Sequence, residues 1–223
     1  GSGSSGKKSE VSFMRIISPA VEANPFSAKE ITEIRTALEE DQVIVYPTDT
    51  LYGLGADVTS TKAVDTLYSL KSRDNSPISV LLSSNHQLLE MATDLSNKAI
   101  ELIKAFLPGA LTVICRTDYE FAPQLISQMG TVGFRVPGDS ISRELPEMFG
   151  KPITTTSVNP AGMKPASSRS EVEAYYANQI DLMIDIGPIN PSRGSTVIDV
   201  SSSPFKILRE GEISRQALQE FLN

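Results

Sequence analysis

The chain has 223 residues, of which 40% are hydrophobic and 21% charged, a composition typical of a globular protein with a buried core. Its net charge of −7 is unlike the basic surface of a general nucleic-acid-binding protein, although a small basic pocket is compatible with it. No apolar run is long enough to cross a membrane and no secretory signal precedes the first helix, so a cytoplasmic protein without membrane contact is expected.

The chain has one cysteine, Cys115, which excludes an internal disulfide and a cysteine-based metal cluster. No metal site is expected from the protein's own side chains.

Residues 1–6 contain only Gly and Ser, which is typical of an expression tag. We therefore expect residues 1–13 to be a tag or a disordered N-terminus, with Met14 as the native start. No repeat or low-complexity linker divides residues 14–223, so a single domain is expected there.

The predicted elements begin with a strand at residues 14–17. Ser27 and Glu30 have the spacing of a capping box, which predicts the start of an amphipathic helix. A helix at 141–149 is expected to end at Gly150, because glycine tolerates the left-handed conformation that follows many helices. Further strands are expected at 43–45, 78–82, 111–115, 131–136, 153–156, 182–186, 196–200 and 205–208, and further helices at 61–71, 86–92, 97–106, 170–177 and from 214 onward.

Helices and strands alternate in the first half of this pattern, whereas strands follow one another with few helices near the end. This order favours a mixed sheet over a regular doubly wound one. The predicted fold class is α/β, with a twisted mixed sheet of about seven or more strands flanked by helices.

The segment 46–55, Tyr-Pro-Thr-Asp-Thr-Leu-Tyr-Gly-Leu-Gly, follows the expected strand at 43–45, which Pro47 should end. Its glycines, proline, hydroxyls and carboxylate suit either a ligand-binding loop or a tight strand-to-helix connection, and the sequence leaves both open. It is not a dinucleotide-binding fingerprint, because Val58 stands where the third glycine is required.

Lys71 and Arg73 lie at the end of a predicted helix, with Asn75 just beyond them. Cations at a helix C-terminus are favoured by the helix dipole, which is the simpler explanation of the pair. Lysine and arginine are also the usual partners of phosphate and carboxylate groups.

Arg135 stands alone in an otherwise apolar predicted strand, where a charge needs a partner or an anionic ligand. Ser157 and Asn159 end a run of hydroxyl residues that could bind phosphate or ribose, although threonine is also a common structural choice in edge strands. Three further segments are less informative alone. One is the turn 108–112, which ends at Thr112, and the others are 194–199 and 207–211, which are considered together.

Taken together, six motifs occur in the order found in the threonylcarbamoyl-AMP synthases, the YrdC-like family, which the sequence resembles across residues 43–211. The motifs are Pro-Thr-acid-Thr-x-Tyr-Gly-Leu-Gly, Lys-x-Arg, Pro-Gly-x-Leu-Thr, Arg-x-Pro, Ser-x-Asn, and Ser-Thr-Val with a final Leu-Arg-x-Gly. The resemblance implies a YrdC-like (DHBP-synthase-like) architecture with a central concave anion-binding pocket. Two features depart from the family: Asp74 follows Lys-x-Arg and brings Pro77 one residue early, and Leu81 or Leu82 stands where the family often has His.

The resemblance also implies residue roles. The implied catalytic residues are Lys71, Arg73, Ser157 and Asn159. The implied threonine contacts are Thr48, Arg135 and Ser195. The implied ATP contacts are Lys71, Arg73, Asn75, Thr112, Ser157, Asn159 and Arg209.

The implied reaction joins L-threonine, bicarbonate and ATP, with Mg²⁺ on the ATP, to give threonylcarbamoyl-AMP and pyrophosphate. This nucleotidyl transfer would serve tRNA modification, with a downstream tRNA threonylcarbamoyl transferase as partner. The alternative is a YrdC-like paralogue that binds tRNA, double-stranded RNA or a nucleotide without synthesis. A carbamoyl-adenylate module of the hydrogenase-maturation type is a further alternative, normally found in a much longer chain.

Other reactive residues have simpler interpretations. His86 is the only histidine, and it follows Ser84 and Asn85, either of which would cap a helix, so an exposed first-turn position is expected. A Ser-His-Asp triad therefore has little support. Cys115 is expected to be a small buried hydrophobe, and Asp181 and Asp185 to be solvated carboxylates at the two ends of a strand.

Overall fold

The computed structural model describes residues 13–21, 23–72 and 78–223. Its strands are β1 (Arg15–Ile17), β2 (Ile44–Pro47), β3 (Tyr52–Gly55), β4 (Ser79–Leu81), β5 (Ala92–Thr93), β6 (Leu111–Thr117), β7 (Thr131–Arg135), β8 (Ile153–Thr155), β9 (Leu182–Ile184), β10 (Thr196–Asp199) and β11 (Lys206–Arg209). Its α-helices are α1 (Ala28–Glu39), α2 (Thr61–Leu70), α3 (Asn85–Met91), α4 (Asn97–Phe106), α5 (Ser140–Phe149), α6 (Arg169–Tyr176) and α7 (Gln219–Leu222).

Local sequence signals placed the helix ends correctly. The capping box is present at α1, where Glu30 N donates to Ser27 Oγ at 3.2 Å and Ser27 N donates to Glu30 Oε1 at 2.9 Å. Gly150 ends α5 in the left-handed conformation, with φ of 83°. The last helix differs from its prediction, because the chain first forms a 3₁₀ turn at Gln216–Leu218 and becomes α-helical only afterwards.

Strand β3 was not predicted. Residues Tyr52–Gly55 form the second arm of a hairpin with β2, in antiparallel register from Ile44 opposite Gly55 to Pro47 opposite Tyr52. Pro47 is therefore the last residue of β2 and does not lie beyond its end. Glycine normally weakens a strand, which made the segment resemble a loop. Here both glycines face the Tyr46 ring, where a Cβ would lie 3.1 Å from it at Gly53 and 2.7 Å at Gly55.

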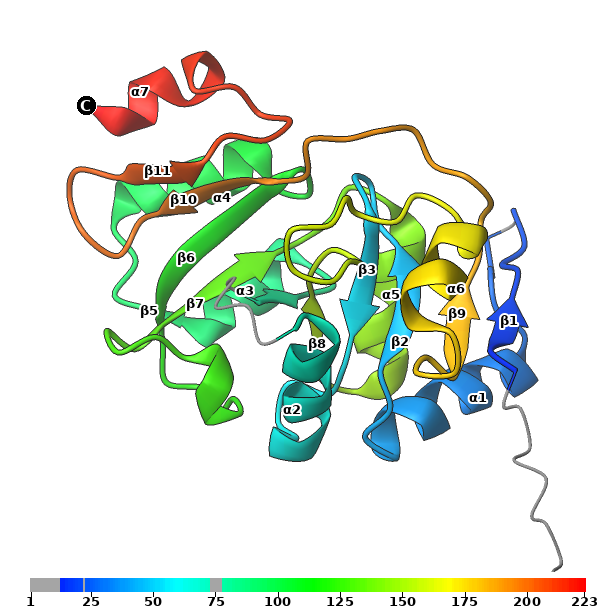
Figure 1. Cartoon of the computed structure of the whole chain (residues 1–223). Helices are drawn as coiled ribbons and strands as arrows, with labels where there is room; N and C mark the ends of the chain where they lie inside the picture. The colour runs from blue at the N-terminus through cyan, green and yellow to red at the C-terminus, as the bar shows by residue number, and fades with distance from the viewer. Residues whose placement is uncertain (1–12, 22, 73–77) are drawn as a thin grey trace, which may run out of the picture.

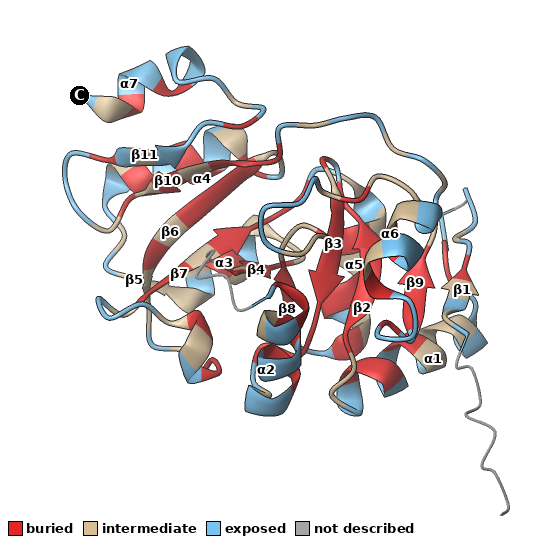
Figure 2. Ribbon diagram, in the orientation of Figure 1, coloured by how far each residue is buried: buried red, intermediate tan, exposed pale blue. Residues whose placement is uncertain are grey.

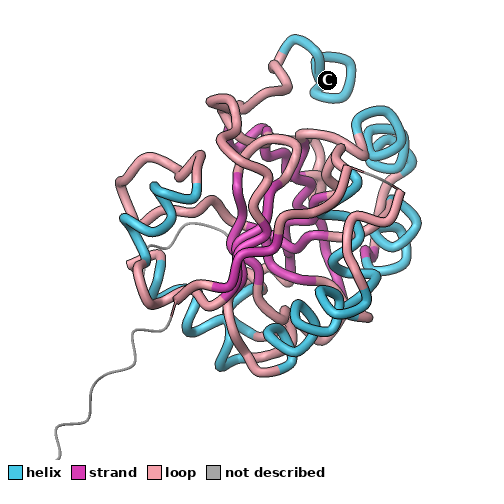
Figure 3. The backbone as a smooth tube through the Cα atoms, turned by 90° about the vertical axis from the view of Figure 1, so that its right-hand side faces the viewer, coloured by secondary structure: helices cyan, strands magenta, loops and turns pink. Residues whose placement is uncertain are grey.

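The strands form two sheets, which lie side by side in Figure 1. One has four strands in the order β1-β9-β2-β3, and the other has seven, in the order β11-β10-β6-β7-β4-β8 with β5 paired to β6. Parallel pairs such as β4 with β7 occur beside antiparallel pairs such as β6 with β7. Helices lie on both sides of the strands in the rotated view of Figure 3. The predicted mixed α/β sheet of seven or more strands flanked by helices is confirmed.

The two sheets meet where β3 lies against β8. Bridges join Gly53 to Ser157 and Asp57 to Ile153, and Leu54 N donates to Thr156 O at 2.8 Å. The Tyr46 hydroxyl donates to Thr154 O at 2.7 Å, so a buried side chain of the first sheet also bonds to the second. Burial raises the pKa of Tyr46 above its ordinary value, which keeps this hydroxyl a neutral donor. The ends of β3 and β8 are thereby held in a fixed relation.

Two apolar clusters pack against the sheets. Figure 2 shows buried residues along the strands of both sheets. Side chains alternate along β2, so that Ile44 and Tyr46 join the cluster that includes residues of α1 and α5, while Val45 joins the cluster that includes residues of α2, α4 and α6. In the part of the chain that the structure describes, none of the helices has both the length and the apolar character needed to cross a membrane.

The glycines of β3 give a stability prediction. Gly55→Ala would place a Cβ 2.7 Å from the fully buried Tyr46 ring, which cannot move aside, so we expect a loss of about 1–3 kcal/mol in the free energy of unfolding. Gly53→Ala, with its nearest contact at 3.1 Å, is the matched control and should lose less. Urea denaturation measures both variants. A loss at Gly53 equal to or greater than that at Gly55 would contradict the packing described here.

Candidate active site

Polar side chains form a row across the seven-stranded sheet. The pairing registers place Arg135 of β7 opposite Thr112 of β6, Thr112 opposite Val197 of β10, and Val197 opposite Arg209 of β11. Residues directly opposite in a sheet share a face, and Ser195 shares it as well, because it lies two residues before Val197. Four predicted site residues from distant segments therefore meet on one face: Thr112, Arg135, Ser195 and Arg209.

Hydrogen bonds join three members of this row, Thr112, Ser195 and Arg209. The Thr112 and Ser195 hydroxyls lie 2.8 Å apart, and Arg209 Nη2 donates to Ser195 O at 2.9 Å. The row stays open at Gly133, because a Cβ there would lie 3.0 Å from Ser79 Oγ and 3.1 Å from Thr112 Cγ2. Gly133 thus leaves room on this face between the hydroxyls of two strands.

The segments 194–199 and 207–211 pair through β10 and β11, and Gly211 is essential to their close approach. A Cβ on Gly211 would lie 2.3 Å from Gly194 O and 2.6 Å from the Ser195 carbonyl, both of them backbone groups that cannot move aside cheaply. Gly211 N donates to Thr196 Oγ1 at 2.9 Å, and Glu212 N donates to Gly194 O at 2.9 Å. This contact fixes Ser195 and Arg209 relative to each other.

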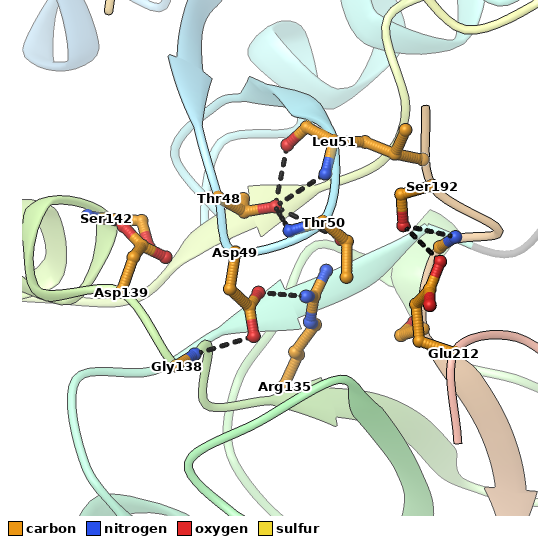
Figure 4. Close-up of polar contacts among 12 residues, drawn as sticks. Thr48, Asp49, Thr50, Leu51, Arg135, Gly138, Asp139, Ser142, Ser192 and Glu212 are labelled. Carbon is orange, nitrogen blue, oxygen red and sulfur yellow. Dashed lines mark hydrogen bonds and ion pairs between the residues drawn. The ribbon is translucent and has the colours of Figure 1, made fainter. Parts of the chain in front are cut away.

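Arg135, the isolated arginine that needed a partner or an anion, pairs with Asp49 at the tip of the β2–β3 hairpin (Figure 4). The other carboxylate oxygen of Asp49 accepts from Gly138 N at 2.8 Å. Only 7% of the Arg135 side chain and 19% of the Asp49 side chain are exposed, so the ion pair is largely shielded from water. It joins the hairpin of one sheet to the central strand of the other.

Arg209 is a second guanidinium close to Arg135. Burial lowers the pKa of Arg209 below its ordinary value, and the charge of Arg135 lowers it further. Among the described residues only Arg135 of the two is paired to a carboxylate, and two like charges held near each other in this way favour the arrival of an anion.

Thr48 uses its hydroxyl inside the hairpin loop. Its Oγ1 donates to Leu51 O at 2.6 Å and accepts from Leu51 N at 3.1 Å and Thr50 N at 3.2 Å, as Figure 4 shows. These bonds close the turn that carries Asp49. Thr48 therefore lines the site mainly as part of a fixed loop.

A cavity of about 570 Å³ opens between this hairpin loop and the segment before β10, within the usual size range of small-molecule sites. Tyr52 anchors that segment: its hydroxyl donates to Gly187 O at 2.7 Å and accepts from Ile186 N at 3.1 Å. The residues lining the cavity are Thr48, Asp49, Thr50, Ala110, Pro188, Ile189, Asn190, Pro191, Ser192 and Glu212.

Lys71, Ser157 and Asn159 form a second polar group. Lys71 follows the end of α2, but its side chain is buried and its Nζ donates to Ser157 O at 2.8 Å and to Asn159 Oδ1 at 3.3 Å. The Ser157 hydroxyl donates to Asn159 Oδ1 at 2.6 Å. The ammonium thus reaches a distant segment, beyond what the dipole of its own helix requires. The structure brings together three of the four predicted catalytic residues.

Arg73 and Asn75, together with the Asp74–Pro77 departure from the family pattern, lie outside the described residues. Leu81 and Leu82, where the family often has His, are fully buried.

Sequence reasoning gave no role to several residues that shape the site. Asp49 carried a detectable signal, since it is the acid of the Pro-Thr-acid-Thr motif and Arg135 needed a countercharge. Tyr52 was visible only as part of the same motif. Glu212 and the cavity-lining segment 188–192 had no local signal, because long-range contacts set their positions.

The reactive residues with simpler interpretations behave mostly as expected. Ser84 caps α3, and His86 is exposed and pairs with Glu90 at 3.1 Å. Cys115 is 1% exposed. Asp185 differs from its prediction as a solvated carboxylate, because it accepts from Gly187 N at 2.8 Å and from the Tyr52 hydroxyl at 3.2 Å.

Fold and site together define a mixed α/β protein of two sheets, with one row of polar side chains across the seven-stranded sheet and a second polar group around Lys71. The chain belongs to the Sua5/YciO/YrdC family, whose model carries the description "Telomere recombination" and matches residues 36–211.

Three known proteins illustrate the similarity. The threonylcarbamoyl-AMP synthase of Bacillus subtilis is 32% identical over 194 residues, which cover 85% of this chain and 56% of that protein. The crystal structure of Pyrococcus abyssi Sua5 complexed with L-threonine aligns with a TM-score of 0.81 at 26% identity, over 94% of this chain and 61% of that one. Escherichia coli YciO aligns with a TM-score of 0.82 at 27% identity, over 95% of this chain and 100% of that one. This chain thus spans less than two thirds of the first two proteins.

Cys115 gives a prediction about reactivity. Burial raises the pKa of its thiol to about 12, with a smaller contribution from the charge of Asp199. An unfolded thiol titrates near 8.5, so at pH 8 the reactive thiolate belongs to the unfolded chain, and thiol labelling of the folded protein should be slower by at least about 100-fold. Because the folded pKa is the higher one, the contribution of this thiol to stability is lost as the pH rises above about 8.5.

Labelling with a chromogenic disulfide in buffer and in guanidinium measures the difference. Equal rates in the two solvents would show that Cys115 is accessible in the folded protein.

Proposed function

We propose that this protein is a threonylcarbamoyl-AMP synthase, which forms threonylcarbamoyl-AMP and pyrophosphate from L-threonine, bicarbonate and ATP. The observation that carries the proposal is the row Arg135–Thr112–Ser195–Arg209, since it gathers two cations and two hydroxyls on one sheet face beside a cavity. Membership of the Sua5/YciO/YrdC family supports it, because relatives such as the Bacillus subtilis protein bear that name.

The proposed reaction has two bond-forming steps. The amine of threonine first takes up bicarbonate as a carbamate, with loss of water. A carbamate oxygen then attacks the α-phosphorus of ATP, and the bond to the departing pyrophosphate breaks. Each substrate carries at least one negative group, so the task of the protein is to hold these groups together, and positioning alone can contribute on the order of 7–11 kcal/mol in favourable cases.

The row across the seven-stranded sheet and the group around Lys71 would bind different substrates. We assign Arg135 to the carboxylate of threonine, with Ser195 beside it. Thr48 would act by shaping the loop next to the amino acid, since its hydroxyl is already engaged. The proposed phosphate and nucleotide contacts are Lys71, Arg73, Asn75, Thr112, Ser157, Asn159 and Arg209.

Lys71 is the proposed electrostatic centre of the phosphate contacts. Its ammonium is held by the Ser157 carbonyl and the Asn159 amide oxygen, so it needs little reorganisation when charge develops on the leaving pyrophosphate. Such preorganised charge is most effective where water is excluded, and Lys71 is 4% exposed.

Mg²⁺ fits this site as a companion of ATP. Within residues 13–21, 23–72 and 78–223, no cluster of three or more His, Cys, Asp or Glu side chains could hold a metal ion. Mg²⁺ commonly binds through substrate phosphates and water with few protein ligands, so it would arrive on the triphosphate. When bound, it would neutralise phosphate charge.

We also propose a cytoplasmic location and a tRNA threonylcarbamoyl transferase as the downstream partner, because the adenylate is a reactive intermediate that a second enzyme must consume. The nucleotidyltransferase class follows from the transfer of AMP to the carbamate.

The alternative is a paralogue that binds RNA or a nucleotide without synthesis. The similarity to Escherichia coli YciO over the full length of that protein supports this alternative, because the name YciO specifies no activity. The net charge of −7 disfavours an extended RNA footprint. Filter binding of tRNA across salt concentrations separates the two: tight, salt-dependent binding without turnover would favour the paralogue.

The synthase proposal predicts that pyrophosphate release from ATP requires both threonine and bicarbonate. We expect release with all three substrates, and only background release when either threonine or bicarbonate is omitted, because the attacking carbamate forms from these two. A coupled pyrophosphate assay measures this. Release that continues without threonine or without bicarbonate would contradict the proposal.

Lys71→Ala should lower the kcat/KM for pyrophosphate release by at least about 100-fold, because it removes a preorganised positive charge from the phosphate site. Lys62→Ala is the matched control: Lys62 is exposed near the start of the same helix α2, and its removal should leave activity unchanged. Circular dichroism would check that both variants fold. A folded Lys71→Ala protein with wild-type activity would remove Lys71 from the site.

A further inference from the structure

Among the residues that the structure describes, the cavity beside the hairpin loop is lined by two carboxylates, Asp49 and Glu212, and by no lysine or arginine. Arg135 is paired to one of these carboxylates, that of Asp49. A triphosphate brought into this cavity would face negative groups first. The lining instead suits a ligand that carries a positive group as well as a single negative one.

The contacts of Asp49 fix its carboxylate in a position that orients the Arg135 guanidinium. One of its oxygens binds Arg135 Nη2 and the other accepts from Gly138 N at 2.8 Å, so the carboxylate is fixed from two sides. The approach is close enough that a Cβ on Gly138 would lie 3.0 Å from Asp49 Oδ2. The carboxylate therefore orients the guanidinium, and the loop hydrogen bonds of Thr48 orient the carboxylate.

Arg135 keeps hydrogen-bonding capacity after it pairs with Asp49. A guanidinium carries five N–H donors, and the Nε of Arg135 is buried without a partner among the described residues. An orphaned buried donor is costly, and it points to a ligand or an ordered group that satisfies it. A guanidinium can donate hydrogen bonds to the Asp49 carboxylate through one edge and to the carboxylate of a ligand through another edge.

Local charge limits what can bind here. Arg135 and Arg209 supply two positive charges and Asp49 removes one, so a singly charged carboxylate restores balance on this part of the row. Glu212 stays ionised at the opposite wall, because bonds from Arg193 N and the Ser192 hydroxyl lower its pKa. A zwitterion could therefore direct its carboxylate to Arg135 and its ammonium toward the two carboxylates.

We propose that Asp49 is a positioning and specificity residue, which holds the Arg135 guanidinium in place and reserves this end of the cavity for the zwitterion of an α-amino acid over a phosphate. The inference rests on the proposed function, in which that amino acid is threonine. It adds a residue to which no role is assigned by the family motifs, and a reason why the zwitterionic amino acid and the anionic triphosphate do not exchange places.

The test is Asp49→Asn, which keeps the size of the side chain and removes its charge. We expect the KM for threonine to rise by about tenfold or more, since a charge-assisted contact that orients Arg135 is lost, while the KM for ATP changes less than about twofold. Inorganic phosphate should also compete with threonine more strongly, by on the order of fivefold, because the like-charge repulsion is gone.

Asp57→Asn is the matched control. Asp57, which lies between β3 and α2, also forms an ion pair, with Lys151 at 2.6 Å, but it does not line the cavity. Its loss should lower the melting temperature without separating the two KM values. A purely structural role for Asp49 would give the same pattern, so the split between the two KM values decides the question.

The outcomes separate this inference from the proposed function. An active wild-type enzyme with Asp49→Asn unchanged in its threonine KM and its phosphate competition would overturn the role of Asp49 alone. A wild-type protein without threonine-dependent pyrophosphate release would overturn the proposed function and this inference with it.

Discussion

A guanidinium cannot remain unpaired inside an apolar sheet, and in this protein the countercharge for Arg135 comes from a different sheet. Asp49 stands at the tip of the β2–β3 hairpin, and its ion pair with Arg135 draws that hairpin over the polar row of the seven-stranded sheet. Removing one partner of a shielded pair typically leaves an uncompensated buried charge, which is strongly destabilising. Asp49 also lines the cavity, so this contact holds one wall of the cavity against the row.

The rest of the architecture supports that contact. Tyr46 bonds to the Thr154 carbonyl across the junction of the two sheets, and Gly53 and Gly55 leave the space its ring occupies. Gly211 allows the backbone near Gly194 and Ser195 to approach closely on the other side. Each of these positions is occupied by a residue whose size the packing dictates, so the site is largely preformed.

The sequence predicted most helices and strands because their signals are local. The capping box at Ser27 and the glycine at 150 need no knowledge of the fold. Strand β3 could not be predicted in this way, because its glycines weaken a strand locally and are explained only by the distant Tyr46 ring. The role of Lys71 was hidden for a similar reason: its position after a helix had a sufficient local explanation, and its partners lie 86 and 88 residues away.

For the site, the sequence identified what Arg135 needed but not which residue would supply it. Asp49 can be identified as the partner of Arg135 only when the registers of both sheets are known, and the residues alone do not specify them. The segment 188–192 carried no signal, since the Tyr52 hydroxyl places it from more than a hundred residues away. Ordered motifs compensated for these gaps, because a shared order of motifs reflects a shared three-dimensional arrangement.

We expect the row and the Lys71 group to flank a single assembly of threonine and ATP where the sheets meet. A crystal structure with L-threonine and a non-hydrolysable ATP analogue tests it most directly. We expect the carboxylate of threonine within hydrogen-bond distance of Arg135, with Asp49 still paired, and the phosphates beside Lys71. Threonine bound away from Arg135, or phosphates seated against Asp49 and Glu212, would contradict the claim.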